Sequence, residues 1–130
     1  MWLRKKVMRL LPPQDPPEGL CPGHKQGLKI IGLGESTMAG VGIPKHSETL
    51  TGLTASRLNA ITDRSIDWKI LAENGLTIGQ LNELIKNQDH PEAEIIMVAI
   101  GGNDVFKLTS PLKWEKQLKN CLFLLQKKKS

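Results

Sequence analysis

A chain of 130 residues with three Trp, two Phe and no Tyr can form one domain whose core is mainly aliphatic. Its net charge of +5 comes from the two ends, because residues 12–106 hold seven basic and twelve acidic residues. An acidic body argues against a nucleic-acid-binding protein, which usually carries a basic face on its folded part. Cys21 and Cys121 lie too far apart in sequence to indicate a metal site or a disulfide framework, so we expect two unpaired thiols.

The first 27 residues differ in composition from the rest of the chain. Residues 1–11 carry four positive charges and no acid. They lack the continuous apolar stretch of a signal peptide, and no stretch of the chain reaches transmembrane length, so we expect a cytoplasmic protein. A short amphipathic helix resting on a membrane surface is an alternative for this segment.

Five prolines between residues 12 and 27 predict a linker outside any helix or sheet. The expected domains are a basic N-terminal segment with a Pro-rich linker, 1–27, and an α/β domain, 28–130.

Strand and helix patterns alternate three times after residue 27. The expected strands are 28–33, 66–72 and 95–100, of which the last is a continuous apolar run typical of a central parallel strand. The helices that follow are expected to begin at Ser47, at Thr77, which forms a capping box with Gln80, and at Ser110. Their expected apolar stripes are Leu50, Leu53, Leu58 and Ile61 on the first helix, Ile78, Leu81, Leu84 and Ile85 on the second, and Trp114, Leu118, Cys121, Leu122 and Leu125 on the third. This order of elements predicts a parallel sheet with helices on both sides.

Three short loops follow the expected strands, and each offers one group suited to acyl transfer. Ser36 offers a nucleophilic hydroxyl, Gly75 a backbone N–H that a carbonyl oxygen can approach closely, and Asn103 a side-chain amide donor. Because the carboxyl ends of parallel strands meet at one edge of a sheet, we expect the three residues to converge there. A nucleophile flanked by two oxyanion donors is the minimum geometry for acyl transfer. The alternative is that Ser36 is only a cap in a flexible loop.

The motifs in these loops resemble the sequence blocks of the SGNH, or GDSL-type, serine hydrolases, a family of esterases and lipases. Gly34-Glu35-Ser36 resembles the first block, Asn74-Gly75 the second, and Gly101-Gly102-Asn103-Asp104 the third. The resemblance spans about residues 28–125. It implies a flavodoxin-like three-layer α/β/α sandwich, with Ser36 as the nucleophile. It also implies an oxyanion hole made of the backbone N–H groups of Ser36 and Gly75 together with the Asn103 amide, and it implies no cofactor and no metal.

Two departures from the family pattern affect the catalytic machinery. Glu35 stands where the family has Asp, so the carboxylate that would brace the nucleophile turn is displaced by one methylene. The fourth block, Asp-x-x-His, is absent, and we therefore expect a C-terminally truncated form of the fold. A serine hydroxyl is a poor nucleophile without a base. His24 falls in the linker and His90 precedes the third strand, which leaves His46 as the histidine close enough in sequence to Ser36 to be tested as a base.

The first functional interpretation is a serine ester hydrolase by family, inactive at this length, whose partner is a small-molecule ester or acyl substrate. One alternative is a non-catalytic remnant that binds such a ligand. Another is a basic-tailed protein that binds an anionic membrane surface or nucleic acid, although we expect no nucleic-acid partner for the acidic body. The strand 95–100 is expected to form an unprotected sheet edge, because the family's further strands are missing, and self-association through that edge is expected.

Overall fold

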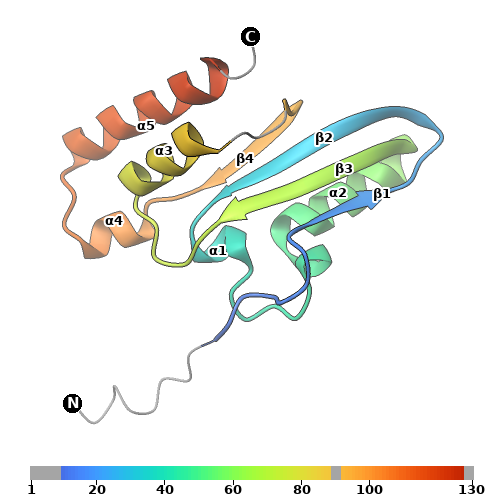
Figure 1. The fold of residues 1–130 in the computed structure, drawn as a ribbon, viewed down its shortest axis with the longest axis horizontal. Coiled ribbons are helices and arrows are strands. Elements are labelled where there is room, and N and C mark those ends of the chain that lie inside the picture. The colour runs from blue at the N-terminus through green and yellow to red at the C-terminus, as the bar shows by residue number, and fades with distance from the viewer. Residues whose placement is uncertain (1–9, 89–91, 128–130) are drawn as a thin grey trace.

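The computed structural model describes residues 10–88 and 92–127, which form a four-stranded sheet with helices on both faces (Figure 1). The strands are β1 (Glu18–Cys21), β2 (Lys25–Gly34), β3 (Arg64–Ala72) and β4 (Ile95–Ala99). The helices are α1 (Ser36–Ala39), the 3-10 helix η2 (His46–Glu48), α2 (Leu50–Thr62), α3 (Ile78–Asn87), α4 (Gly102–Phe106) and α5 (Pro111–Lys127). Residues 1–9, His90 and residues 128–130, on which parts of the sequence-based predictions fall, lie outside the described residues.

Strand β2 lies in the interior of the sheet, whose order is β1-β3-β2-β4. It runs parallel to β3 on one side and to β4 on the other. Gly34, its last residue, lies level with Ala72 of β3 and with Ala99 of β4. The three parallel strands therefore end at the same edge of the sheet. All three predicted parallel strands are confirmed, and β4 forms an edge of the described sheet, as expected.

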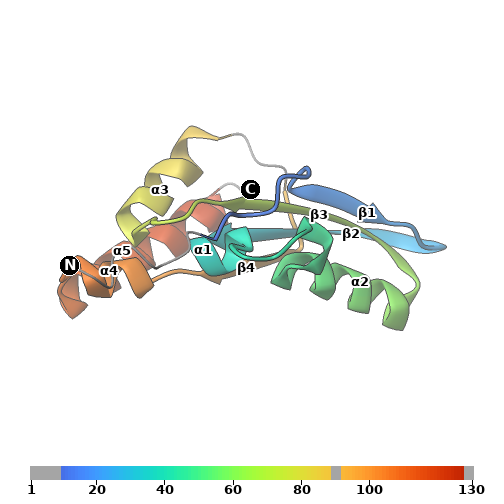
Figure 2. The same cartoon turned by 90° about the horizontal axis from the view of Figure 1, so that it is seen from below.

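The core consists of two clusters, one on each face of the sheet. On one face, Ile31 and Leu33 of β2 pack with Leu81 and Ile85 of α3 and with Cys121 of α5. On the other face, a second cluster combines β2 and β3 with α1 and α2; it contains Ile30, Met38, Ala55, Ile66, Trp68 and Ile70. Figure 2 shows α2 and α3 on opposite sides of the sheet. The predicted three-layer α/β/α architecture is confirmed.

The prediction that the Pro-rich segment takes no part in a sheet is wrong. Strand β1 lies inside this segment and pairs antiparallel with β3, and Ile70 N–H donates to the carbonyl of Pro17 just before β1. Proline is compatible with this arrangement because β1 is an edge strand and its prolines lie outside its four residues. Strand β2 also begins three residues earlier than predicted, at Lys25.

Helix α2 differs from its prediction in both its cap and its buried face. Its N-cap is Thr49, whose side chain accepts from the Gly52 N–H, and the predicted cap Ser47 lies in η2. The predicted stripe residues Leu50, Leu53 and Ile61 are exposed, whereas Thr51, Gly52 and Ala55 are buried. The reason is a close approach between helix and sheet at Gly32, where a Cβ atom would lie 2.2 Å from Thr51 Oγ1. Only small residues fit this contact, so the leucines face outward.

The predictions for α3 and α5 are largely confirmed. Thr77 and Gln80 form the expected capping box of α3, which buries Ile78, Leu81 and Ile85. Ser110 Oγ accepts from Lys113 N–H at the start of α5, but Leu122 on the predicted stripe of α5 is exposed. The two cysteines are both free thiols, as expected, and burial raises the pKa of Cys121.

Candidate active site

The three predicted loops lie side by side at the carboxyl ends of the parallel strands. The backbone N–H of Glu35, in the loop after β2, donates to the carbonyl of Ala99 at the end of β4 at 3.0 Å. The N–H of Glu73, in the loop after β3, donates to the carbonyl of Gly34 at 3.2 Å. Gly34 is required at this crossing, since a Cβ atom on it would lie 2.0 Å from the Ala99 carbonyl oxygen. Backbone contacts therefore fix the three loops against one another.

Asn103 connects the three loops through its side chain. Its Nδ2 donates to Glu35 Oε2 at 2.9 Å and to the carbonyl of Leu76 at 3.0 Å. Its backbone N–H also donates to Glu35 Oε2, at 3.3 Å. Glu35 precedes Ser36 and Leu76 follows Gly75, so the amide group of Asn103 joins its own loop to the loops of both Ser36 and Gly75. Both hydrogens of that amide are engaged, and a substrate oxyanion would have to replace one of their acceptors.

Ser36 is the first residue of α1, and its hydroxyl makes no hydrogen bond with any described residue. The N-cap position is held by Glu35, in an extended conformation, and not by Ser36. The interpretation of Ser36 as a cap therefore has no hydrogen bond to support it. The side chain is half-buried at the sheet edge, where a hydroxyl that is not bonded to the described part of the chain can contact a ligand.

Gly75 presents an open stretch of backbone at the same edge. Its φ of +87° lies in the left-handed region, and apart from its two chain neighbours no described residue has an atom within 4 Å of the position that a Cβ would take. Any other residue would be strained here by its backbone conformation, although space for a side chain exists. The bare backbone leaves the peptide at Gly75 accessible to a bound molecule.

Asp104 is a buried carboxylate whose role the sequence did not reveal. It is 3% exposed, and its Oδ2 accepts from the backbone N–H of Ile78 at 2.9 Å. Ile78 begins α3, so Asp104 satisfies an N–H group that has no partner within the helix and places a negative charge at the positive end of the helix dipole. The bond connects the third loop to the helix that follows the second. The Asn-Asp sequence was visible, but the acceptor is 26 residues away from its donor and no local pattern indicates the pair.

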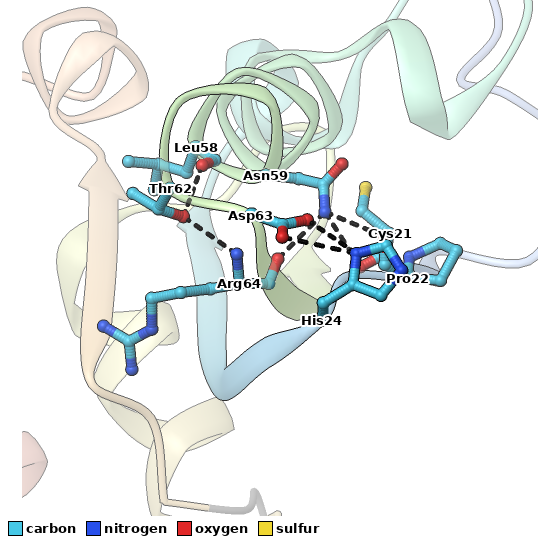
Figure 3. Close-up of polar contacts among 8 residues, drawn as sticks. All are labelled: Cys21, Pro22, His24, Leu58, Asn59, Thr62, Asp63 and Arg64. Carbon is cyan, nitrogen blue, oxygen red and sulfur yellow. Dashed lines mark hydrogen bonds and ion pairs between the residues drawn. The ribbon is translucent and has the colours of Figure 1, made fainter.

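Neither of the two histidines that the structure describes, His24 and His46, supplies a base in contact with Ser36. His24 Nδ1 lies 3.2 Å from Asp63 Oδ1, beside Asn59 and Arg64 (Figure 3). Asp63 immediately precedes β3, so this pair lies at the amino end of the parallel strands, away from the candidate site.

His46 is buried and forms a pair with Asp15 of the Pro-rich segment. Asp15 Oδ1 accepts from the backbone N–H of His46 at 3.1 Å and lies 2.8 Å from its Nδ1. These bonds, the backbone bond above all, hold the pKa of Asp15 below its ordinary value. His46 faces a cavity of about 430 Å³ whose lining includes Ala39 and Asn74 but not Ser36. The lining residues Ala39 and Asn74 are close in sequence to Ser36 and Gly75, so the cavity borders the candidate-site loops along the chain. Sequence analysis missed Asp15 because its partner, His46, is 31 residues away.

The fold is shared with esterases of the SGNH-hydrolase class. Comparison of the sequence with protein-family profiles and with curated proteins finds no match. Among solved structures, the fold matches AlinE4, described as an SGNH-hydrolase family esterase, with a TM-score of 0.68 and 24% identity over 82% of this chain and 57% of AlinE4. It also matches TesA, with a TM-score of 0.65 and 15% identity over 78% of this chain and 56% of TesA. The chain thus spans less than two thirds of the length of either protein.

Proposed function

We propose that this chain carries the nucleophile and oxyanion loops of a serine ester hydrolase. The observation that carries the proposal is the network around Asn103, which joins the loops of Ser36 and Gly75 while the Ser36 hydroxyl makes no hydrogen bond with residues 10–88 or 92–127. The shared fold with AlinE4 and TesA supports it. The substrate class is a small ester or acyl compound, because such a carbonyl fits between one hydroxyl and a set of N–H donors.

The chemical step is attack of Ser36 Oγ on the ester carbonyl carbon. The C–O bond that forms pushes an electron pair onto the carbonyl oxygen, and that oxyanion is stabilised by the N–H groups of Ser36 and Gly75. The Asn103 amide joins them once it gives up its bond to Glu35 or to Leu76. Collapse of the intermediate expels the alcohol and leaves an acyl group on Ser36, which water then removes.

The serine proton needs a base, and no described residue accepts a hydrogen bond from Ser36. We therefore expect hydrolysis of short p-nitrophenyl esters close to the buffer background. A second candidate function, binding of an ester or acyl ligand without turnover, is favoured by the same observation and by the engagement of both Asn103 amide hydrogens.

A fluorophosphonate probe separates these two functions. With added imidazole as an external base, we expect a slow covalent adduct that peptide mass spectrometry places on Ser36. Ser36→Ala should abolish the adduct, and Ser47→Ala, which removes an exposed serine outside the candidate site, should leave it unchanged. Absence of any Ser36 adduct with or without imidazole would favour the binding function. A high esterase rate that disappears in both Ser36→Ala and His46→Ala would identify His46 as the base and overturn the expected low activity.

A further inference from the structure

The turn between α4 and α5 lies at one end of the molecule (Figure 1). A cluster of exposed apolar residues lies in and around this turn. The cluster, here called the apolar tip, consists of Val105, Phe106, Leu108 and Leu112, whose exposed fractions lie between 71% and 90%. Val105 and Phe106 are the last two residues of α4, Leu108 follows that helix, and Leu112 lies in the first turn of α5. Four strongly exposed apolar side chains within eight residues of the chain indicate a contact site.

The backbone of the apolar tip is held in place by hydrogen bonds. Leu108 N–H donates to the Val105 carbonyl at 3.1 Å, and Thr109 N–H donates to the Asp104 carbonyl at 3.0 Å. Leu108 has a φ of +56°, in the left-handed region that a bulky residue rarely adopts. The turn therefore presents a leucine outward at a position where glycine or asparagine would be the ordinary choice. Because its backbone is held in this way, the turn keeps its apolar side chains outside the core.

Exposed lysines lie within and just after the apolar tip in the sequence, and acidic residues are almost absent from this part of the chain. Lys107 lies inside the cluster, and Lys113 and Lys116 follow it on α5, all three exposed. Glu115 is the single acid between residues 105 and 127, and it is paired with Lys119 at 2.8 Å. Exposed apolar side chains next to exposed lysines match a surface that is anionic at its head groups and apolar just below them.

We propose that the apolar tip and its lysines dock on the surface of a membrane that contains anionic phospholipids. Phe106 and Leu108 enter the boundary between head groups and acyl chains, while Lys107 and Lys113 contact lipid phosphates. Asn103 lies on the same short helix as Val105 and Phe106, so docking brings the candidate site close to the lipid surface. The docking does not depend on Ser36 and stands apart from the proposed hydrolysis.

Vesicle flotation tests the proposal with the full chain. We expect the protein to float with phosphatidylcholine vesicles that contain 30% phosphatidylserine, and to stay unbound with pure phosphatidylcholine or in high salt. Lys107→Gln with Lys113→Gln should weaken binding roughly 25-fold, about fivefold for each lysine. The control Lys25→Gln with Lys29→Gln makes the same change of net charge at the start of β2 and should leave binding unchanged.

The apolar part is tested by Phe106→Ser with Leu108→Asn, since asparagine tolerates the left-handed conformation. This variant should bind the anionic vesicles at least roughly tenfold more weakly than the parent chain. Leu53→Ser with Ile61→Asn removes exposed apolar side chains from α2 and should bind as the parent does. Circular-dichroism melting confirms that each variant is folded.

Three outcomes would overturn the proposal. The first is no binding to anionic vesicles, as expected if the apolar tip contacts another protein. The second is binding that both the tip variants and their controls reduce equally. The third is binding that survives the tip variants and is lost when the basic residues of the segment 1–9 are changed to glutamine.

Discussion

The hydrogen bond between Asp104 and the first residue of α3 makes a testable contribution to stability. Asp104 is 3% exposed, and its Oδ2 accepts from Ile78 N–H at 2.9 Å. Its second oxygen accepts a longer bond of 3.4 Å from Thr109 Oγ1. The perturbation that we consider is Asp104→Ala, which removes both acceptors and leaves the Ile78 N–H buried without a partner.

The expected cost follows from the charged acceptor. Hydrogen bonds to charged groups contribute about 1.5–3 kcal/mol, and a carboxylate at a helix N-terminus contributes up to about 2 kcal/mol in partly buried geometry. The two figures describe largely the same contact and are not added. We therefore expect Asp104→Ala to lower the free energy of unfolding by about 2–3 kcal/mol. Asp104→Asn keeps the shape and one acceptor oxygen, and because neutral bonds are about half as strong, its cost should be about 1 kcal/mol.

Urea denaturation followed by circular dichroism measures both variants against the parent chain. Glu83→Ala serves as the matched control. Glu83 is an acidic residue of α3, and the contact that the substitution removes is an exposed ion pair with Lys86. Exposed pairs of this kind contribute about 0–1 kcal/mol. The reasoning fails if Asp104→Ala destabilises no more than Glu83→Ala, or if the asparagine variant is as unstable as the alanine variant.

Three further predictions concern the Pro-rich segment, the sheet edge and the nucleophile loop. The bonds from His46 lower the pKa of Asp15 from its ordinary 3.8, so Asp15 stabilises the fold above that pH, and the contribution is lost as pH falls through the depressed value. Urea denaturation should thus find Asp15→Asn less stable than the parent chain at pH 7, with the gap closing below pH 3.8; a gap that widens in acid would contradict this. The chain should self-associate through β4, and Val98→Lys, a charge on the exposed edge, should shift it toward monomer in light scattering; a dilution-resistant monomeric parent would refute this. Glu35→Asp should shorten the reach of the carboxylate to the Asn103 amide and speed fluorophosphonate labelling of Ser36; an unchanged or slower rate would show that this bond does not limit the site.

Local pattern predicted the parallel part of the sheet because two of its strands are apolar runs followed by glycine. The third, 66–72, alternates apolar and charged residues and ends at Glu73. Local pattern failed for β1, since the edge position that makes prolines tolerable is a property of the whole sheet. It failed for the buried face of α2 for a similar reason. The leucines give the helical period, but the contact between Gly32 and Thr51 decides which side of the helix faces the sheet.

The candidate site was predictable in its position but not in its bonding. Parallel strands place the loops after Gly34, Ala72 and Ala99 at the same edge of the sheet, which follows from topology once the strands are assigned. The partners of Asn103 depend on the length of the Glu35 side chain and on the path of the chain at Leu76. Neither can be obtained from residue spacing.

Glu35 links the stability of the loops to the chemistry proposed for them. A glutamate at this position reaches Asn103 with one carboxylate oxygen and accepts from both its backbone and its side-chain N–H. The side-chain N–H is also the group that would stabilise an oxyanion, so the same amide cannot serve both partners with the same hydrogen. A carboxylate is a stronger acceptor than a neutral ester carbonyl, and the bond to Glu35 should therefore persist when a substrate binds. Only the negative charge that develops on the carbonyl oxygen during attack can compete with it. Glu35 thus orders the loops but keeps the Asn103 amide from acting as a free oxyanion donor. This agrees with the low activity proposed for this chain.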